Sequence, residues 1–217
     1  MFSESGRKLF AKPVAGLVHW LQKTGVTPNA LTYTGFLLTV LTAILLAWGH
    51  FRLGALLLLV AAFFDMLDGA LARLSEQSST FGAFLDSTLD RYSESVTFLA
   101  LALFYSHDSS TRTELVLVFV ILIGSLMVSY TRARAEALNI ECKAGMLQRP
   151  ERIVLLLVGL LSGWMLPVLW IMAILTNVSA LQRIYEVYWR TARRADAANK
   201  TPANKIVNSG DNRPAQS

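Results

Sequence analysis

The amino-acid sequence predicts an all-α integral membrane protein, with six transmembrane helices preceded by an N-terminal amphipathic helix in the membrane interface. Composition is the first reason. Of the 217 residues, 53% are hydrophobic and only 16% are charged, whereas soluble domains carry about 25% charged residues. The mean hydropathy of +0.44 points the same way. The apolar residues also gather in long runs, which predicts helices that cross a bilayer.

The first segment, residues 1–24, is predicted to form the amphipathic helix. Its apolar residues recur at helical spacing, at Phe10, Val14, Leu17, Val18 and Leu21. The lysines of this segment lie off that stripe, which is typical of a helix in the headgroup plane. A helix that packs on its own protein is equally compatible with the pattern. The mixture of lysines and apolar residues argues against a cleavable signal peptide.

Six apolar runs predict the transmembrane helices, over about residues 31–48, 53–74, 81–105, 115–138, 152–161 and 167–185. The fifth run is short for a hydrocarbon core of about 30 Å, so this helix is allowed to begin near Arg149. Residues 25–194 are therefore expected to form one membrane domain. Residues 195–217 have hardly any apolar side chains, and a disordered cytoplasmic tail is expected there.

The distribution of charge predicts the orientation in the cell membrane. Arg52 and Arg112 are the only basic residues in the loops of one side, and the other side collects most of the lysines and arginines. Because short basic loops stay in the cytoplasm, both termini are expected to be cytoplasmic. The net charge of +5 fits contact with anionic lipid or phosphate, and no nucleic acid partner is expected. The single cysteine, Cys142, excludes an intramolecular disulfide and is expected to be inert.

Four aspartates lie inside the predicted transmembrane helices. Asp65 and Asp68 end one helix, and Asp86 and Asp90 lie in the next, after a short polar connection. Spacings of three and four residues put each pair on one helix face, so two antiparallel neighbours can gather all four carboxylates in one pocket. Charges in a membrane need compensation, and all-oxygen ligands favour Mg²⁺ or Mn²⁺. The sequence therefore predicts one or two divalent cations here.

Two other interpretations of these acids remain open. The acids could simply pair with Arg73 and Arg91, although four acids outnumber two arginines. They could also form the path of a cation carrier, whose carboxylates usually lie near the bilayer midplane. Asp68, however, is expected roughly 22 Å along its helix, near the cytoplasmic end. This position favours a site open to cytoplasmic solutes.

Small residues and an arginine surround the acids. Gly69 follows Asp68, and Gly82 lies just after the turn. Glycine removes side-chain bulk where a ligand must approach the backbone. Arg73 lies close by, and a guanidinium beside a metal cluster is a ready partner for phosphate oxygens. Together these residues predict a site for a diphosphate.

The segment of residues 65–90 resembles the full signature of the CDP-alcohol phosphatidyltransferase family. All eight fixed positions of that signature match, at Asp65, Asp68, Gly69, Ala72, Arg73, Gly82, Asp86 and Asp90. The six predicted spans and the N-terminal helix extend the resemblance over most of the chain.

The resemblance implies a reaction in which an alcohol displaces CMP from a CDP-linked lipid, with two Mg²⁺ ions, or Mn²⁺, between the carboxylates. Carried over by position, Asp65, Asp68 and Asp86 would hold the first metal. Asp65, Asp86 and Asp90 would hold the second. Asp90 would also act as the base that takes the proton of the acceptor hydroxyl.

The resemblance also implies which residues contact the CDP part of the lipid. These are Gly69, Arg73 and Ser79, together with the segment Thr27, Pro28, Asn29 and Ala30 at the mouth of the first span. From its residues alone, that segment is equally a helix start with Pro and Asn as capping residues.

A second basic cluster closes the fourth predicted span and opens the fifth, with Arg132, Arg149 and Arg152. Charge-assisted donors of this kind suit a phosphorylated polyol. The two segments resemble the phosphatidylinositol-phosphate synthase branch, which implies CDP-diacylglycerol as the lipid and inositol 1-phosphate as the acceptor. Two residues depart from it: Arg132 stands where that branch commonly has Lys, and Gln148 where it has an acid. Glycerol 3-phosphate is therefore kept as a second acceptor, and positive-inside anchoring as another use of the arginines.

Two further features stay open in the sequence. Glu94, one turn beyond Asp90, is interpreted either as an acid that supports the site or as a polar group on the helix. Gly159 and Gly163 have a spacing that permits close helix contact. Because members of the resembling family are often homodimers, a homodimer is expected.

Overall fold

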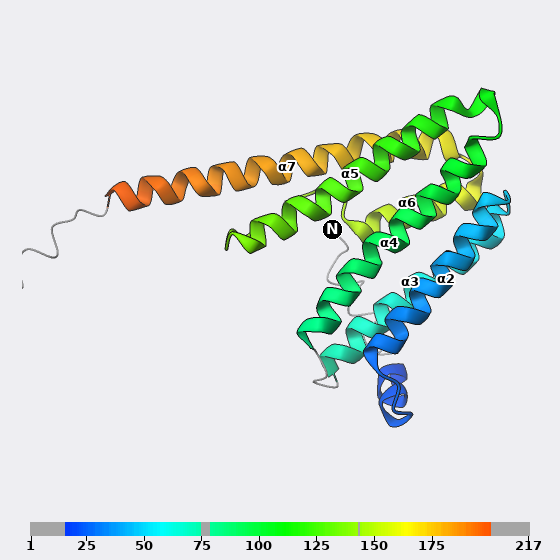
Figure 1. Ribbon diagram of the computed structural model, residues 1–217, viewed down its shortest axis with the longest axis horizontal. Coiled ribbons are helices and arrows are strands. Elements are labelled where there is room, and N and C mark those ends of the chain that lie inside the picture. The colour runs from blue at the N-terminus through cyan, green and yellow to red at the C-terminus, as the bar shows by residue number, and fades with distance from the viewer. Residues whose placement is uncertain (1–15, 75–78, 143, 201–217) are drawn as a thin grey trace, which may run out of the picture.

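Long helices make up nearly all of the described chain. The computed structural model describes residues 16–74, 79–142 and 144–200, without the side chains of Leu74 and of residues 195–200. Within these residues the protein is helical and has no strand. A helical segment at residues 16–23 is followed by α2 (Pro28–Ala47), α3 (Phe51–Leu74), α4 (Thr80–Tyr105), the 3-10 helix η1 (Ser109–Thr111), α5 (Arg112–Ala137), α6 (Arg149–Ser162) and α7 (Met165–Lys200) (Figure 1).

Helix α6 begins where the sequence allowed it to begin, at Arg149. A capping box fixes this start, because the side chains of Gln148 and Glu151 each accept a backbone N–H of the first turn. The helix ends at Gly163, which adopts the left-handed conformation with φ of 79°. Helix α2 likewise starts with Thr27 as its N-cap and a proline in the first turn. The interpretation of residues 27–30 as a helix start is therefore confirmed, although the N-cap is Thr27 and not Pro28 or Asn29.

Four helices are long and apolar enough to cross a membrane: Pro28–Ala47, Phe51–Arg73, Ser109–Ala137 and Met165–Arg194. Helix α4 is not among them, and within residues 86–94 it carries four charged residues: Asp86, Asp90, Arg91 and Glu94. Helix α6 has only 14 residues, or roughly 21 Å of rise. The described chain is therefore a membrane-integral helical protein.

The helices associate so that α6 joins two groups. Helix α2 contacts both α3 and α4, whereas α5 contacts α7 and α4. Helix α6 lies against α7 on one side and α3 on the other. The buried core joins Leu46 of α2, Phe98 of α4 and Ile121 of α5 with residues of α7, and apolar burial of this kind drives the association of the helices. The fold thus brings the first turn of α6 next to the end of α3.

The connections divide the molecule into two ends. The α2–α3, α4–α5 and α6–α7 connections lie toward the right of Figure 1, and at the opposite end α3 and α5 end while α4 and α6 begin. All four aspartates and all four arginines of the predicted site (Arg73, Arg132, Arg149 and Arg152) lie on the helix segments near this second end. Because successive helices run in opposite directions, the residues of the predicted site lie together at one end of the molecule.

The described part of the N-terminal segment packs on the protein. Val18 is fully buried against Leu31 of α2 and against Leu67 and Leu71 of α3. Trp20, on another face, is 60% exposed. For residues 16–23 the structure thus favours the alternative of a helix packed on its own protein. Residues 1–15 of the predicted amphipathic helix lie outside the described residues.

The C-terminal end differs from the prediction, because α7 continues to Lys200 instead of ending near residue 185. Residues 186–200 contain neither Pro nor Gly and are rich in Ala and Arg, which favour helix. Residues 195–200 of the predicted tail are therefore part of α7. The remaining tail, residues 201–217, lies outside the described residues.

Candidate active site

Three of the four aspartates form a compact cluster. One carboxylate oxygen each from Asp65, Asp68 and Asp86 lies within 4.8 Å of the others. Helix α2 packs against both helices that carry them, α3 and α4, and so holds the two pairs face to face. We call these three residues the carboxylate triad. Asp90 is not part of this triad in the described structure.

The carboxylate triad is suited to a divalent cation. Asp68 is only 3% exposed, and its Oδ2 atom has no hydrogen-bond partner in the structure. A buried carboxylate oxygen without a donor is costly, and two further carboxylates of the same charge stand beside it. An all-oxygen ligand set fits a hard cation such as Mg²⁺ or Mn²⁺. These three residues are the set predicted for the first metal.

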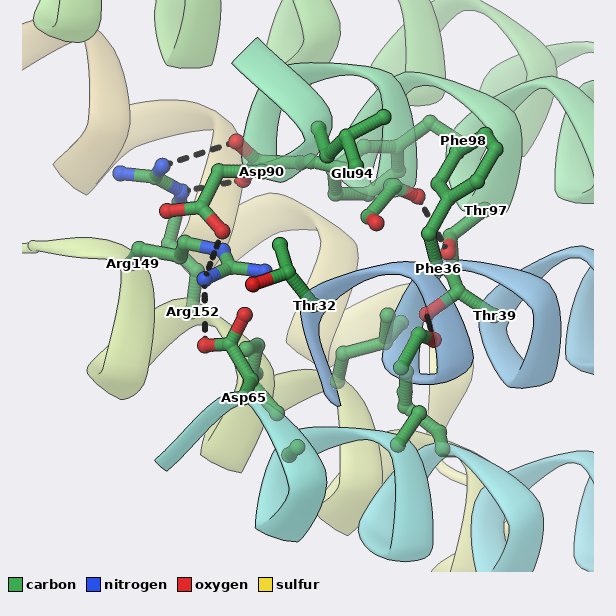
Figure 2. Close-up of a pocket in the computed structure, with 18 of the residues that line it drawn as sticks. Thr32, Phe36, Thr39, Asp65, Asp90, Glu94, Thr97, Phe98, Arg149 and Arg152 are labelled. Carbon is green, nitrogen blue, oxygen red and sulfur yellow. Dashed lines mark hydrogen bonds and ion pairs between the residues drawn. The ribbon is translucent and has the colours of Figure 1, made fainter. Parts of the chain in front are cut away.

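Asp90 is bound to an arginine from a distant helix. The Nη1 atom of Arg149 lies 2.6 Å from Asp65 Oδ2 and 2.6 Å from Asp90 Oδ1 (Figure 2). Arg91 adds a longer ion pair, 3.6 Å from Asp90 Oδ2. The interpretation that Arg73 and Arg91 neutralise the acids is therefore corrected, because Arg149 supplies the closest positive charge. Asp65 thus belongs both to the triad and to this pair.

A cavity of about 170 Å³ opens beside the triad, and Asp68 and Asp86 form part of its wall. We call it the nucleotide-side cavity. It is lined by five residues predicted to contact the CDP part: Pro28, Asn29, Gly69, Arg73 and Ser79. Gly82 fits tightly here, since a Cβ atom added to it would lie 3.0 Å from Ser79 Oγ and 3.1 Å from Asn29 Oδ1.

The other two predicted contacts, Thr27 and Ala30, are not in the described lining of this cavity. Thr27 Oγ1 accepts the backbone N–H of Ala30 at 3.3 Å and so caps α2. These two residues fix the turn on which Pro28 and Asn29 stand.

A second cavity, of about 250 Å³, lies on the Asp90 side of the cluster. We call it the acceptor cavity. All three predicted arginines line it: Arg132, Arg149 and Arg152. Arg91, Ser129 and Arg183 line it too, and the sequence reasoning did not assign them to this site. Arg183 had a detectable signal, because an arginine inside a predicted transmembrane segment marks a functional or paired group.

The three predicted arginines differ in their surroundings. Arg152 is 3% exposed, with Nε 2.5 Å and Nη2 2.9 Å from the two oxygens of Glu94, and with Nη1 3.1 Å from the carbonyl oxygen of Leu147 (Figure 2). All three of its nitrogens are thus engaged. Arg132 is exposed and uses Nε on Glu136 at 2.8 Å. The bidentate pair favours the interpretation of Glu94 as an acid that supports the site.

The single cysteine lies outside this chemistry. Cys142, in the connection between α5 and α6, is 3% exposed. Burial, and then the neighbouring Glu186 carboxylate, raise the pKa of the Cys142 thiol above its ordinary value. A thiol that stays protonated at neutral pH is a poor nucleophile, which agrees with the expected inert role.

Comparison with known proteins decides the family. A model of the family described as CDP-alcohol phosphatidyltransferase matches residues 25–184. The chain belongs to this family. The resemblance seen in residues 65–90 is thereby confirmed, and the protein is a transferase of phospholipid biosynthesis. The alternative of an intramembrane cation carrier is not supported.

Relatives within the CDP-alcohol phosphatidyltransferase family have narrower names. The archaetidylinositol phosphate synthase of Pyrococcus horikoshii is 38% identical over 176 residues, covering 81% of this chain and 90% of the relative. The phosphatidylinositol phosphate synthase of Mycobacteroides abscessus is 34% identical over 189 residues, covering 83% of this chain and 86% of the relative.

Solved structures support the same fold. The Mycobacterium tuberculosis phosphatidylinositol phosphate synthase with CDP-DAG bound matches with a TM-score of 0.75 at 29% identity, over 81% of this chain and 93% of that chain. The same enzyme has also been solved in complex with manganese and citrate. A divalent cation in that structure agrees with the oxygen ligands of the carboxylate triad.

Proposed function

We propose that this CDP-alcohol phosphatidyltransferase transfers the phosphatidyl group of CDP-diacylglycerol to a hydroxyl of inositol 1-phosphate, giving phosphatidylinositol phosphate and CMP. The main observation behind the proposal is that the carboxylates lie between two cavities. Asp68 and Asp86 line the nucleotide-side cavity, and Asp90 lines the acceptor cavity with its arginines. Relatives named as inositol phosphate lipid synthases support this acceptor.

The nucleotide-side cavity is proposed to hold the CDP part of the lipid. Arg73 offers a charge to the diphosphate, and the glycines leave room for it to approach the backbone. The proposed contacts are Thr27, Pro28, Asn29, Ala30, Gly69, Arg73 and Ser79. Five of them line the cavity, and Thr27 and Ala30 act by fixing the start of α2.

Two Mg²⁺ ions, or Mn²⁺, are proposed to bind at the carboxylates. Asp65, Asp68 and Asp86 would hold the first, and Asp65, Asp86 and Asp90 the second. Such ions, when bound, polarise the diphosphate and neutralise the leaving CMP. The unpartnered Oδ2 atom of Asp68 supports the first set. The second set has support from Asp65 and Asp90, which share one arginine nitrogen.

Asp90 is proposed as the general base. It lines the cavity assigned to the acceptor, so a hydroxyl bound there can reach its carboxylate. Arg149 Nη1 holds the Oδ1 atom of Asp90 at 2.6 Å, which fixes the direction of the side chain. A positioned carboxylate of this kind takes the proton as the hydroxyl oxygen attacks phosphorus.

The phosphate of the acceptor is proposed to bind at the arginines of the acceptor cavity. Arg132 and Arg149 suit this role, since each uses only one nitrogen in the ion pairs described above. Arg152 was predicted as a third donor, but Glu94 and Leu147 already occupy its nitrogens. We therefore propose that Arg152 supports the cavity and that the other two arginines grip the phosphate.

The arrangement in the membrane is part of the same proposal. Helices α2 to α7 would supply six spans in a domain of residues 25–194, in a multi-pass protein of the cell membrane. The site would face the cytoplasm, on the side where most of the basic residues gather. Two copies would form a homodimer.

The experiment that tests the function is an acceptor panel. Purified full-length protein in detergent receives CDP-diacylglycerol, Mg²⁺ and one acceptor: inositol 1-phosphate, glycerol 3-phosphate, inositol or serine. CMP release and the mass of the lipid product are measured together. Inositol 1-phosphate is expected to give matching amounts of CMP and phosphatidylinositol phosphate. Turnover only with unphosphorylated inositol or serine would contradict the proposal.

Glycerol 3-phosphate is the second candidate acceptor, giving phosphatidylglycerophosphate by the same chemistry. The acceptor cavity favours it in one respect, because the arginines recognise a phosphate and not a ring. Gln148, which stands where the inositol phosphate branch has an acid, lines this cavity. A higher kcat/KM for glycerol 3-phosphate than for inositol 1-phosphate would select this alternative.

A further inference from the structure

The connection between α5 and α6, residues 138–148, is bonded along one face of α7. The backbone N–H of Leu147 donates to Ser179 Oγ at 2.9 Å. That of Met146 donates to a side-chain oxygen of Gln182 at 3.2 Å. That of Ala144 donates to Glu186 Oε2 at 2.8 Å. These three side chains, which accept the hydrogen bonds, are spaced by three and four residues and so share a helix face. We call Ser179, Gln182 and Glu186 the α7 ladder.

The same face of α7 also donates to the connection. Arg183, only 4% exposed, donates Nε to the carbonyl oxygen of Ala144 at 2.8 Å and Nη1 to that of Val128 in α5. Farther along, Arg194 donates to the carbonyl oxygen of Asn139 at 2.7 Å. Three N–H groups and two carbonyl oxygens of the described connection backbone are thus bonded to side chains of α7.

The close fit requires a glycine in the connection. Gly145 has a φ of +128° and an added Cβ atom would lie 3.2 Å from Arg183 Nε. Glycine adopts such a conformation without steric cost and leaves the backbone free to approach α7. The path of the connection is therefore determined by contact with α7.

The connection leads directly into the acceptor cavity. Leu147 donates its N–H to Ser179 and accepts Nη1 of Arg152 on its carbonyl oxygen. Its main-chain groups are therefore fixed from both sides, by α7 and by α6. Arg149 follows two residues later and reaches Asp65 and Asp90. A shift of the connection would move Arg149 relative to these carboxylates.

We propose that Ser179, Gln182 and Glu186 are positioning residues of the acceptor site: through the backbone of residues 144–147 they set the place of Arg149. This inference rests on the function proposed above for the acceptor cavity. In the described structure, the residues lining that cavity do not include these three. Their effect on the acceptor is therefore exerted through the connection and not by contact.

The test compares truncating and conservative substitutions in the full-length protein. Gln182→Ala and Glu186→Ala remove the side-chain oxygen that accepts a hydrogen bond from the connection backbone. Gln182→Glu and Glu186→Gln keep such an oxygen. Each truncation is expected to raise the KM for inositol 1-phosphate about three- to tenfold, the value of a lost hydrogen bond. The KM for CDP-diacylglycerol should stay unchanged. In the conservative variants, the KM for inositol 1-phosphate should return close to the wild-type value.

Thr191→Ala is the matched control, because the Thr191 hydroxyl donates to Val187 within α7. This variant should change neither the KM for inositol 1-phosphate nor the KM for CDP-diacylglycerol. Limited proteolysis supplies a second measurement that needs no turnover, and cleavage within residues 138–148 should become faster in the truncated variants alone. Unchanged acceptor KM in both truncated variants, or an equal rise of both KM values without rescue, would overturn the inference.

The test remains distinct from that of the proposed function. If the wild-type protein prefers glycerol 3-phosphate, the inositol assignment fails, and the same variants are measured with that acceptor. The positioning role predicts the same rise in the KM for glycerol 3-phosphate, because Arg149 would bind the phosphate that both acceptors carry.

Discussion

The carboxylate triad and the acceptor cavity adjoin each other but are built in opposite ways. The triad comes from one stretch of 22 residues, 65–86, and gathers charges of a single sign, with one buried oxygen lacking a donor. The arginines of the acceptor cavity come from α4, α5, α6 and α7, and those of α6 and α7 are held by ion pairs or hydrogen bonds to protein oxygens. The triad is therefore suited to a cation, whereas the arginines of the acceptor cavity are held in place by contacts within the protein.

Arg149 connects the two regions. Its ion pairs with Asp65 and Asp90 place one guanidinium between the metal ligands and the acceptor cavity. Gly82 on one side and Arg132 on the other lie away from these ion pairs, so their variants test one region at a time. The following substitutions compare such positions with those at the carboxylates and at Arg149, beginning with the largest expected effect.

Asp86→Asn should abolish activity. The loss of a carboxylate that bridges both proposed metals removes several kcal/mol of transition-state stabilisation, so turnover should fall about a thousandfold or more. CMP release in the presence of Mg²⁺ measures this effect, and excess chelator should reproduce it in the wild-type protein. Asp108→Asn is the control, since Asp108 caps η1 in the α4–α5 connection. Full turnover in chelator would refute the role given to the triad.

Asp90→Asn should lower kcat about 10²- to 10⁴-fold, the usual contribution of a general base. Binding of CDP-diacylglycerol should persist, because the nucleotide-side cavity does not include Asp90 among its described lining residues. Parallel measurements of kcat and of the CDP-diacylglycerol Kd separate the two effects. If binding is lost to the same extent as turnover, Asp90 acts chiefly as a metal ligand.

Arg149→Gln should raise the KM for the phosphorylated acceptor about ten- to a hundredfold, as expected for a lost charge-assisted hydrogen bond. Arg132→Lys should change it much less, because a lysine still offers a charge to one phosphate oxygen. Steady-state kinetics with both substrates distinguishes the two cavities. An equal rise in the KM for CDP-diacylglycerol would show that Arg149 serves only the carboxylates.

Arg152→Gln should act on stability more than on binding. It leaves Glu94, whose side chain is only 14% exposed, without its bidentate partner, and the loss of one partner of such a pair destabilises by up to about 3 kcal/mol. The expected result is a lower Tm in detergent, with a smaller change in acceptor KM than for Arg149→Gln. A large KM effect at unchanged Tm would restore Arg152 as a direct phosphate ligand.

Gly82→Ala should have the smallest effect and should act on the nucleotide side. The new Cβ atom would lie 3.0 Å from Ser79 Oγ, closer than ordinary contact, so the wall of the cavity must shift. The KM for CDP-diacylglycerol should rise severalfold while that for the acceptor stays constant. Gly16→Ala serves as the control, because a Cβ atom there meets nothing within 4 Å. If both variants have the same KM for CDP-diacylglycerol, Gly82 does not contribute to binding in the nucleotide-side cavity.

The sequence by itself determined the helices and the chemistry of the triad. Apolar runs, the capping residues of α2 and α6, and the three- and four-residue spacing of the aspartates all act within a few turns of chain. The signature in residues 65–90 was sufficient to predict the family, because its fixed positions are local.

Only the tertiary structure decided how the charges are paired. Arg149 meets Asp65 across 84 residues of sequence, and Arg152 meets Glu94 across 58. The same holds for the contact of Val18 with α2 and α3, and for the α7 ladder that holds the connection before α6. No periodicity within one segment encodes such pairs, because they depend on which helix faces meet once the apolar surfaces are buried.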